Sequence, residues 1–530
     1  MFGVQGILKR GEPALTQSPG SWDVSSEVLG EECYSCVFQI REDNHMKMTS
    51  NRIRVAVIGA GAAGLCSARN LLSRPHAFQP PVVFERSLQV GGTWVYSEEP
   101  ETESHQHSSM YRDLRTNLPK EIMEFPDYSF DPSLPSFIHR SEVLRYLEEY
   151  TENFHVRPHI RFNCNVIAVS PVSEDGVGDR VRWDVTSHIW ENPHPVTERF
   201  DAVMVCAGHY SQPYVPDIPG IDTFQGKLLH SHVYRYPESF TSRSVVLLGC
   251  GPSGIDIAIE LAQHAKQVTL CHHGPPIRWT PPKGLSLAPP VVRATPDSLI
   301  CEDGTQLEAD TLIFCTGYKY CYPFLESKMD PRSLKDTEEL VRVTLPNSLS
   351  RSGLLLETQN GHDACNDQLK EGMLAKDTIV IPDEGQGHLP PLYKHLIHAR
   401  YPTLVFIGAC KIVVPFPHVH CQALFFLAVL EGKCPLPSVE QMLSESYKEL
   451  MDHMSVGLPL KYLHRLAKDQ WDYNQWLSKT AGFKPLPPVL RKIYDKCSEF
   501  RNTSPIIYRS LKFEILSSEE FRVNSTDAQI

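Results

Sequence analysis

In two regions of the chain, a short run of apolar, β-branched residues gives way to a glycine-rich turn and then to a helical stretch. The first run covers residues 53–58 and the second covers residues 245–248. Each helical stretch is followed by another apolar run, "PVVFE" in the first region and "QVTLCHH" in the second. Short apolar runs that alternate with helical stretches predict buried strands of a parallel sheet. The pattern therefore predicts an α/β fold with two such units in one chain.

The first turn has the spacing of a dinucleotide-binding fingerprint. Its first glycine permits the tight turn, its second lets the backbone approach a pyrophosphate, and its third lets helix and strand pack closely. The pyrophosphate then lies over the exposed N–H groups of the helix start. Glu85 ends the following strand, where an acid can accept hydrogen bonds from the ribose hydroxyls of an adenosine. The candidate residues of the turn itself are Gly59, Ala60, Gly61, Ala62, Ala63 and Gly64.

The second turn repeats this design with Gly249, Gly251 and Gly254. Its following strand ends in two histidines rather than in a carboxylate. An acid at this place would repel a 2′-phosphate, so the sequence favours NADPH over NADH here. His273 and the nearby Arg278 can attract that phosphate.

The segment after Glu85 indicates which turn holds which cofactor. It reads "RSLQVGGTWVY" and includes Gly92, Thr93 and Trp94. Two glycines beside a tryptophan suit a loop that lies close against a large planar cofactor. We therefore expect FAD at the first turn and NADPH at the second.

Two apolar runs that end in tight turns, at 200–220 and 309–325, look like crossings between the two units. We therefore expect two Rossmann-like dinucleotide-binding domains, with the NADPH domain inserted into a discontinuous FAD domain. The expected divisions are a flexible N-terminal extension at 1–47, the first part of the FAD domain at 48–220, the NADPH domain at 221–315, the second part of the FAD domain at 316–480 with a polar insert at 326–379, and a C-terminal extension at 481–530.

The string "FQGKLLHSHVYRY" (224–236) precedes the second turn, and its residues Phe224, Gly226, His230 and Tyr234 have the spacing F-x-G-x3-H-x3-Y. Here the sequence resembles the flavin-containing monooxygenases, whose motif upstream of the NADPH turn is FxGxxxHxxxY/F. The resemblance covers about residues 52–325 and 380–480 and implies that the string leads from the flavin domain into the NADPH domain. Other matching segments are "YRDLRTNLPKEIMEFPDYSF" (111–130), "HYSQPYVPDIPG" (209–220), "CTGYKY" (315–320) and "PLYKH" (391–395).

The resemblance implies a reaction in which NADPH reduces the flavin and the reduced flavin adds O2 to form a C4a-hydroperoxyflavin. A soft nucleophilic nitrogen or sulfur of a small molecule then takes up the distal oxygen, giving an N- or S-oxide. By this resemblance Asn117 lies over the flavin as the catalytic residue, with Thr116 beside it, and its amide offers both donor and acceptor. A turn-capping role is the alternative for Asn117. The resemblance also implies four NADP contacts at the second helix start: Ser253, Gly254, Ile255 and Asp256.

The sequence departs from the family pattern at His273, because an arginine commonly occupies that position in the family. Two other classes of enzyme share the pairing of FAD with NADPH. Baeyer–Villiger monooxygenases act on ketones, and their longer motif usually has a tryptophan after the histidine, whereas this chain has Ser231 and His232. Disulfide reductases need a cysteine pair that faces the flavin, and the "GGTW" segment has none.

The composition of the chain limits the binding partners that we expect for it. The net charge of −12 argues against nucleic-acid binding. Fifteen cysteines scattered among apolar neighbours suit a reducing compartment, so we expect a cytoplasmic protein. The run "ALFFLAVL" (423–430) is too short for a membrane span, and no membrane anchor is evident. The expected partners are O2 and a small nucleophilic substrate, and a homo-oligomer is compatible with the sequence.

Three groups of cysteines and histidines have the residue types of a metal site. The pair Cys33 and Cys36 lacks a second pair that would complete a zinc site. The other two groups, residues 271–273 and 418–421, are expected to line pockets or the core, and we expect no metal.

Overall fold

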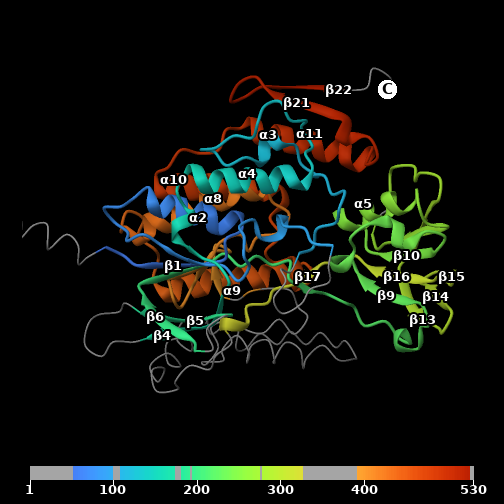
Figure 1. Cartoon of the computed structure of the whole chain (residues 1–530), viewed down its shortest axis with the longest axis horizontal. Helices are drawn as coiled ribbons and strands as arrows, with labels where there is room; N and C mark the ends of the chain where they lie inside the picture. The colour runs from blue at the N-terminus through green and yellow to red at the C-terminus, as the bar shows by residue number, and fades with distance from the viewer. Residues whose placement is uncertain are drawn as a thin grey trace, which may run out of the picture. The chain divides into compact units, whose positions relative to one another are not determined.

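The computed structural model describes residues 52–98, 108–172, 181–190, 194–274, 277–325, 389 and 391–525 (Figure 1). The predicted N-terminal extension, the polar insert at 326–379 and the Cys33–Cys36 pair lie outside the described residues.

Within the described ranges, the first sheet has seven strands in the order β18-β19-β20-β7-β1-β2-β3. The neighbouring strands from β20 to β3 in this order are parallel, whereas β19 pairs with both β18 and β20 in antiparallel fashion. The strands are β1 (Val55–Ile58), β2 (Val82–Phe84), β3 (Ile160–Arg161), β7 (Ala202–Val205), β18 (Leu392–Tyr393), β19 (Ile397–His398) and β20 (Leu404–Phe406).

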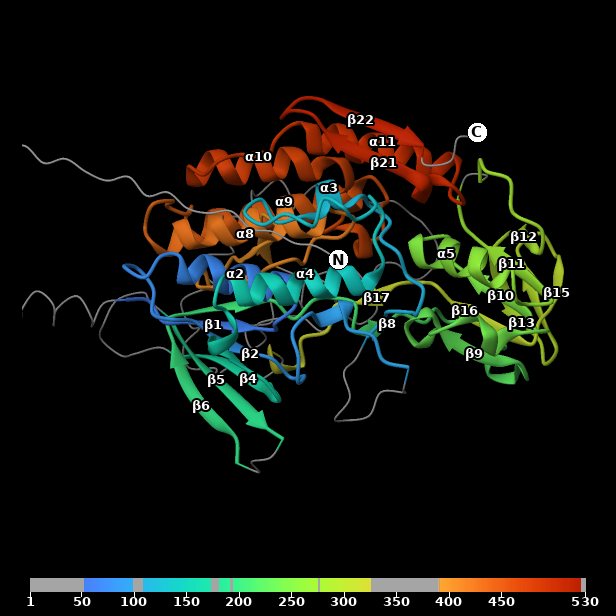
Figure 2. The ribbon, with the colours of Figure 1, turned by 45° about the horizontal axis from the view of Figure 1, so that its top comes forward.

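The two faces of this sheet are covered differently. Val55 and Val57 of β1 pack among helices on one face, and Ala56 and Ile58 pack against an antiparallel meander on the other. Figure 2 shows the helices and the meander on opposite sides of β1. A central strand buried on both faces has to be apolar throughout, which explains the continuous apolar run at 55–58. The meander consists of β4 (Cys164–Val172), β5 (Arg182–Ile189) and β6 (Val196–Phe200).

The helices on the first face come from both ends of the chain. Helix α8 contacts α2, α3 and α10, so segments more than 300 residues apart form one core. In the described part of the chain, no helix has the length and apolarity needed to cross a bilayer. The helices on this face are α2 (Ala62–Leu72), α3 (Lys120–Met123), α4 (Arg140–Asn153), α8 (Pro415–Leu430), α10 (Gln470–Ala481) and α11 (Val489–Thr503). Helix α9 (Val439–Ser455) packs instead against the edge strand β18.

The C-terminal segment belongs to this first core. Helix α11 and the hairpin of β21 (Leu511–Ile515) and β22 (Phe521–Ser525) lie against α3. Ile493, Tyr508 and Phe513 are buried in the same core as α2 and α8. The region expected as an extension at 481–530 therefore contributes to the packing of the first unit.

The second sheet is parallel throughout, with five strands among the described residues in the order β12-β11-β10-β16-β9. Helix α5 (Pro252–Leu261) covers the face of Val245 and Leu247, and an antiparallel meander covers the face of Val246 and Leu248. The sheet strands are β9 (Lys227–His230), β10 (Ser244–Leu248), β11 (Gln267–Cys271), β12 (Leu285–Ala288) and β16 (Thr311–Phe314), and the meander strands are β13 (Val291–Ala294), β14 (Ser298–Cys301) and β15 (Gln306–Glu308).

The prediction of two Rossmann-like α/β units, one inserted into the other, is confirmed. In Figure 1 the second sheet is green to yellow, whereas the first unit takes its colours from both ends of the bar. The two crossings pair with each other, because β8 (Gln212–Pro213) and β17 (Tyr318–Lys319) form an antiparallel ribbon. The chain thus leaves and re-enters the first unit at one place.

The string at 224–236 is more ordered than a plain linker. It supplies β9, the edge strand that pairs with β16, and then the short turn η4 (Ser231–Val233). Arg235 follows, and its guanidinium donates to the carbonyls of Ser97 (2.8 Å), Ser108 (3.1 Å) and Met110 (3.4 Å). The string therefore ties the second unit to the loop that precedes Asn117.

Each helix packs closely on the glycine turn that precedes it, and this contact yields the first prediction. A Cβ added at Gly64 would lie 1.8 Å from the Gly59 carbonyl oxygen, whereas a Cβ at Gly251 would meet no atom of the described residues within 4 Å. Gly64→Ala is expected to destabilise the fold by about 3 kcal/mol or more, because α2 must move off its turn. Gly251→Ala, the control, should cost about 1 kcal/mol or less. Urea unfolding followed by circular dichroism measures both, and equal midpoints for the two variants would contradict this account.

Candidate functional site

The first glycine turn leaves an open backbone surface at the carboxyl end of β1. Gly59 has a φ of +105°, which a residue with a side chain rarely adopts. Gly61 begins α2 without any side-chain cap, so the N–H groups of the first turn, at Ala62 and Ala63, have no capping acceptor in the helix. A Cβ at Gly61 would meet only the backbone of Gly92, at 3.5 Å. The space in front of this turn therefore fits an anionic group such as a pyrophosphate.

Glu85 lies beside the turn and is buried. Its Oε2 accepts a hydrogen bond from the Ala60 N–H (2.7 Å), and its Oε1 accepts from the N–H (2.8 Å) and hydroxyl (2.7 Å) of Ser87. A carboxylate offers about four acceptor positions, so capacity remains for a ribose hydroxyl. Glu85 thus holds the turn in shape and keeps an acceptor for a ligand.

The "GGTW" segment lies against the same turn, as η1 (Gly92–Trp94). The Gly91 N–H donates to the Ala60 carbonyl (3.1 Å), and a Cβ at Gly92 would lie 3.0 Å from the Gly61 Cα. Trp94 is half-buried against the first core. The backbones of Gly92 and Gly61 approach each other closely. If the glycine turn is taken as the first wall of the candidate FAD site, this loop forms the second.

Thr93 connects this wall to the domain crossing. Its hydroxyl lies 3.2 Å from the Ser109 hydroxyl, and Ser109 also bonds the hydroxyl of Tyr318. Burial raises the pKa of Tyr318, so its phenol keeps its proton. A chain of neutral hydroxyl groups therefore runs from the first turn to the ribbon of β8 and β17.

A third wall comes from the turn after β20, which the sequence analysis did not identify. Gly408 has a φ of +80°, and a Cβ there would meet the side chains of Val419 (3.3 Å) and Ala63 (3.9 Å). Its carbonyl accepts from His209 Nδ1 (3.0 Å). Burial lowers the pKa of His209 to about 3, so the ring is neutral and carries its proton on Nδ1. An apolar run that ends in glycine, "LVFIG", was the available signal.

The second glycine turn has the same construction as the first. Gly249 has a φ of +115°, and a Cβ at Gly254 would lie 1.9 Å from the Gly249 carbonyl oxygen. Gly251 begins α5 and faces open space. Ser253 is exposed on the first turn of α5, whereas Ile255 packs partly against the second core. The turn therefore fits a second pyrophosphate, with the Ser253 hydroxyl near its edge.

Three charged or polar candidates of this region lie in different surroundings. His273 is exposed just beyond the end of β11, in the place where a 2′-phosphate reader is expected, and Arg278 is also exposed. Asp256 is instead directed to the first unit, where Arg509 pairs with its carboxylate at 2.6 Å. The Asp256 carboxylate is thus engaged by protein.

Asn117 lies in a short loop between Thr116 and α3. The Thr116 N–H donates to the Ile138 carbonyl (2.8 Å), and the Thr116 hydroxyl accepts from the Ile138 N–H (3.1 Å). Thr116 is therefore buried and uses its side chain to fix the loop. Asn117 is half-buried. A role for either side chain at a flavin stays a prediction.

The structure also places the groups considered as metal ligands. Across the described ranges, no group of three or more His, Cys, Asp or Glu side chains could hold a metal ion. His418 pairs with Asn474 through Nδ1 (3.0 Å), and Cys421 and Cys271 are buried in the cores.

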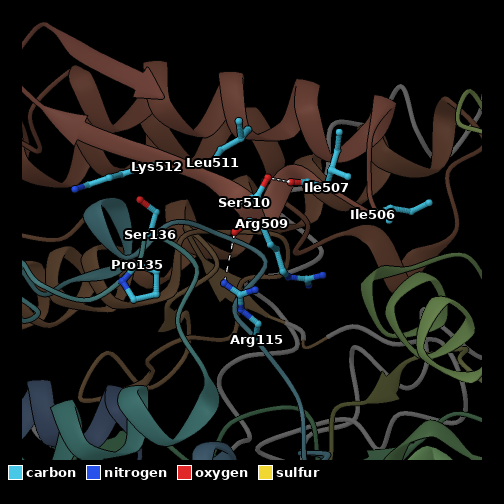
Figure 3. Close-up of a pocket in the computed structure, with 9 residues that line it drawn as sticks. All are labelled: Arg115, Pro135, Ser136, Ile506, Ile507, Arg509, Ser510, Leu511 and Lys512. Carbon is cyan, nitrogen blue, oxygen red and sulfur yellow. Dashed lines mark hydrogen bonds between the residues drawn. The ribbon is translucent and has the colours of Figure 1, made fainter. Parts of the chain in front are cut away.

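A pocket of about 370 Å³ lies between Arg115, two residues before Asn117, and the C-terminal segment at 506–512 (Figure 3). Figure 3 shows Arg115 reaching the backbone of Arg509 across this pocket, at 3.5 Å from Nη2 to the carbonyl. The sequence predicted residues 481–530 only as an extension, so this pocket was not expected from it. The lining residues are Arg115, Pro135, Ser136, Ile506, Ile507, Arg509, Ser510, Leu511 and Lys512.

Comparison with known proteins is consistent with this geometry. The family described as flavin-binding monooxygenase-like matches residues 52–276. The flavin-containing monooxygenase FMO GS-OX-like 4 of Arabidopsis thaliana is 34% identical over 480 residues, which is 86% of this chain and 93% of that protein. The structure of S-allyl-L-cysteine S-oxygenase from Allium sativum matches with 30% identity and a TM-score of 0.71, over 86% of this chain and 95% of that one.

A more distant structure shares the fold alone. Cyclohexanone monooxygenase from Rhodococcus sp. Phi1 matches with 14% identity and a TM-score of 0.53, over 82% of this chain and 98% of that one.

The two open glycines yield a paired prediction. Gly61→Val should fill the pyrophosphate place of the first turn, so the purified protein should contain less than about a tenth of the wild-type FAD. Gly251→Val should do the same at the second turn, so the protein should stay yellow while NADPH no longer reduces its flavin. Flavin absorbance per protein and anaerobic reduction by NADPH measure the two effects. Loss of FAD from Gly251→Val with retention in Gly61→Val would reverse the assignment of the turns.

Proposed function

The chain belongs to the flavin-binding monooxygenase family, and on that premise we propose that it uses FAD, NADPH and O2 to oxygenate soft nucleophilic sulfur or nitrogen in small molecules. One observation carries the proposal: two glycine turns with the same open construction occur in one chain, at Gly61 and Gly251. A protein that only binds a nucleotide needs one such turn. A chain with two can bring a hydride donor and a flavin together.

In this scheme the chain's own residues bind and orient the two cofactors. The first turn and Glu85 would hold FAD, and the second turn with Ser253 and His273 would hold NADPH. When bound, the flavin accepts the hydride and activates O2. The Asn117 amide can donate and accept hydrogen bonds at once, which suits a group that serves flavin, oxygen and nicotinamide in turn.

The similarity to S-allyl-L-cysteine S-oxygenase supports sulfur as the atom oxygenated. That protein is 30% identical to this chain, whereas the ketone-oxidising class is represented by a neighbour that shares the fold alone. The Ser231–His232 pair in the string upstream of the second turn also differs from the tryptophan usual in Baeyer–Villiger enzymes. Ketone oxygenation is the second candidate.

One screen tests the proposal. The holoenzyme is incubated with NADPH, O2 and either a methyl sulfide, a tertiary amine or a cyclic ketone, and both NADPH consumption and product are measured. We expect the wild type to form sulfoxide or N-oxide with little lactone. Gly251→Val should form no oxygenated product. Lactone as the main product would establish the alternative, and no oxygenated product from any class would refute the proposal.

Asn117 provides a prediction about catalysis. Asn117→Ala should keep FAD bound, while product per NADPH falls roughly tenfold to a hundredfold, because one preorganised donor is lost. Asn117→Asp keeps the size but loses the N–H donor and should be equally impaired. Hydrogen peroxide is expected to rise as product falls. Asn502→Ala, an exposed asparagine near the end of α11, is the control and should behave like wild type. Wild-type coupling in Asn117→Ala would show that the side chain serves only the turn.

His273 provides a prediction about the coenzyme. His273→Arg should increase the preference for NADPH over NADH by about tenfold, the size of one charge-assisted hydrogen bond. His273→Asp should shift the preference toward NADH, because a carboxylate repels the 2′-phosphate. The measurement is the ratio of kcat/KM for the two coenzymes, with the exposed His264→Arg as control. If His273→Ala and His273→Asp leave the ratio unchanged, Arg278 is the next residue to test.

A further inference from the structure

Arg509 lies where three distant segments of the chain meet. It is part of the short turn η10 (Tyr508–Ser510) between α11 and β21, and its side chain is 18% exposed. Its Nη1 and Nη2 donate to the two carboxylate oxygens of Asp256, at 3.1 and 2.6 Å, and its Nε donates to the Thr116 carbonyl at 3.0 Å. One guanidinium thus joins the C-terminal segment, the Asn117 loop and the helix of the second turn.

This arrangement uses the whole planar fork of an arginine. Two parallel N–H groups match one carboxylate, and the third donor points to a different acceptor. Burial alone would lower the pKa of Arg509, but the charge and hydrogen bonds of Asp256, together with Tyr508 and Tyr111, outweigh this effect, and the pKa is raised. Lysine could keep the charge but could not supply this set of directed donors.

The C-terminal segment holds the backbone of Asn117 as well. The Cys497 thiol donates to the Asn117 carbonyl (3.8 Å), while Arg509 holds the preceding carbonyl. Tyr508 packs edge-on against Phe137, at 5.1 Å between ring centroids. The peptide groups on both sides of the Asn117 Cα are therefore anchored to residues about 400 positions later in the chain.

Helix α5 presents a second acid to the same side. Glu260 lies one turn after Asp256, and its carboxylate accepts from the Tyr234 hydroxyl (2.6 Å). The Tyr111 hydroxyl lies 3.5 Å from Asp256, and the rings of Tyr111 and Tyr234 pack edge to face. These contacts fix the rotation of α5, whose first turn is the candidate pyrophosphate site.

We propose that Arg509 is a positioning residue for the oxygenation reaction, which holds the Asn117 loop and the NADPH-binding helix α5 in one fixed relation. The inference rests on the proposed function. Arg509 contacts neither cofactor nor substrate in this scheme. Its loss leaves both nucleotide turns intact but frees the Asn117 amide to move relative to α5.

Two variants and a control test this role in the holoenzyme. Arg509→Met should retain FAD, while product per NADPH falls roughly tenfold, because small displacements of a positioned group are costly. Arg509→Lys should keep the wild-type KM for NADPH through its ion pair with Asp256, but its product per NADPH should still fall, because it lacks the donor to Thr116. Arg491→Met removes an exposed ion pair with Asp472 from the same segment and should change neither quantity.

The outcomes separate this inference from the proposed function. A wild-type protein without NADPH-dependent oxygenation refutes the proposed function. If the wild type oxygenates and Arg509→Met lowers only the melting temperature, with wild-type product per NADPH, Arg509 is structural and the inference is wrong. If Arg509→Met does not fold, the product per NADPH of Arg509→Lys is the deciding measurement, and a wild-type value would show that the inference is wrong. In addition, NADP⁺ should slow amide hydrogen exchange at 508–516 in the wild type but not in Arg509→Met, which lacks the ion pair with Asp256, and equal slowing in both would overturn the inference.

Discussion

Both halves of the molecule depend on a helix that sits closer to the preceding turn than any side chain permits. An added Cβ would lie 1.8 Å from a carbonyl oxygen at Gly64 and 1.9 Å at Gly254. This contact aligns the first turn of α2 and of α5 with the carboxyl ends of β1 and β10. The N–H groups at each helix start then face open space beside a glycine, which is the arrangement that favours an anion. The remaining site elements are arranged around these two turns.

The junction between the two units relies on two partly buried arginines, each of which donates through all three of its side-chain nitrogens. Arg235 donates to carbonyls of both units, and Arg509 divides its donors between a carboxylate and a carbonyl. A buried charge is costly unless it is paired and hydrogen-bonded, so these side chains tolerate few other positions of their partners. The ribbon of β8 and β17 adds backbone hydrogen bonds at the same place. A junction of this kind specifies a relation between the units more strictly than apolar packing would.

Three buried rings at the crossing, those of His209, His230 and Tyr318, carry no charge at neutral pH. Burial lowers the pKa of His209 to about 3 and that of His230 to about 4, so both rings are uncharged at neutral pH. Burial also raises the pKa of Tyr318, whose ring lies 5.2 Å from that of His230. These groups can offer hydrogen bonds without a permanent charge.

The sequence by itself determined the parts of this protein that depend on neighbouring residues. The strand, turn, helix and acid of the first unit span only residues 55–85, so their spacing alone predicts the fold and the positions of Gly59, Gly61, Gly64 and Glu85. The same local logic predicted the second turn and the two crossings. Arg509, Gly408 and the hydrogen bonds of Thr116 and Asp256 were decided only by the tertiary structure. Each of these depends on a partner between 22 and 393 residues away, brought close by the packing of α8 and α11, and no spacing within the sequence encodes such a meeting.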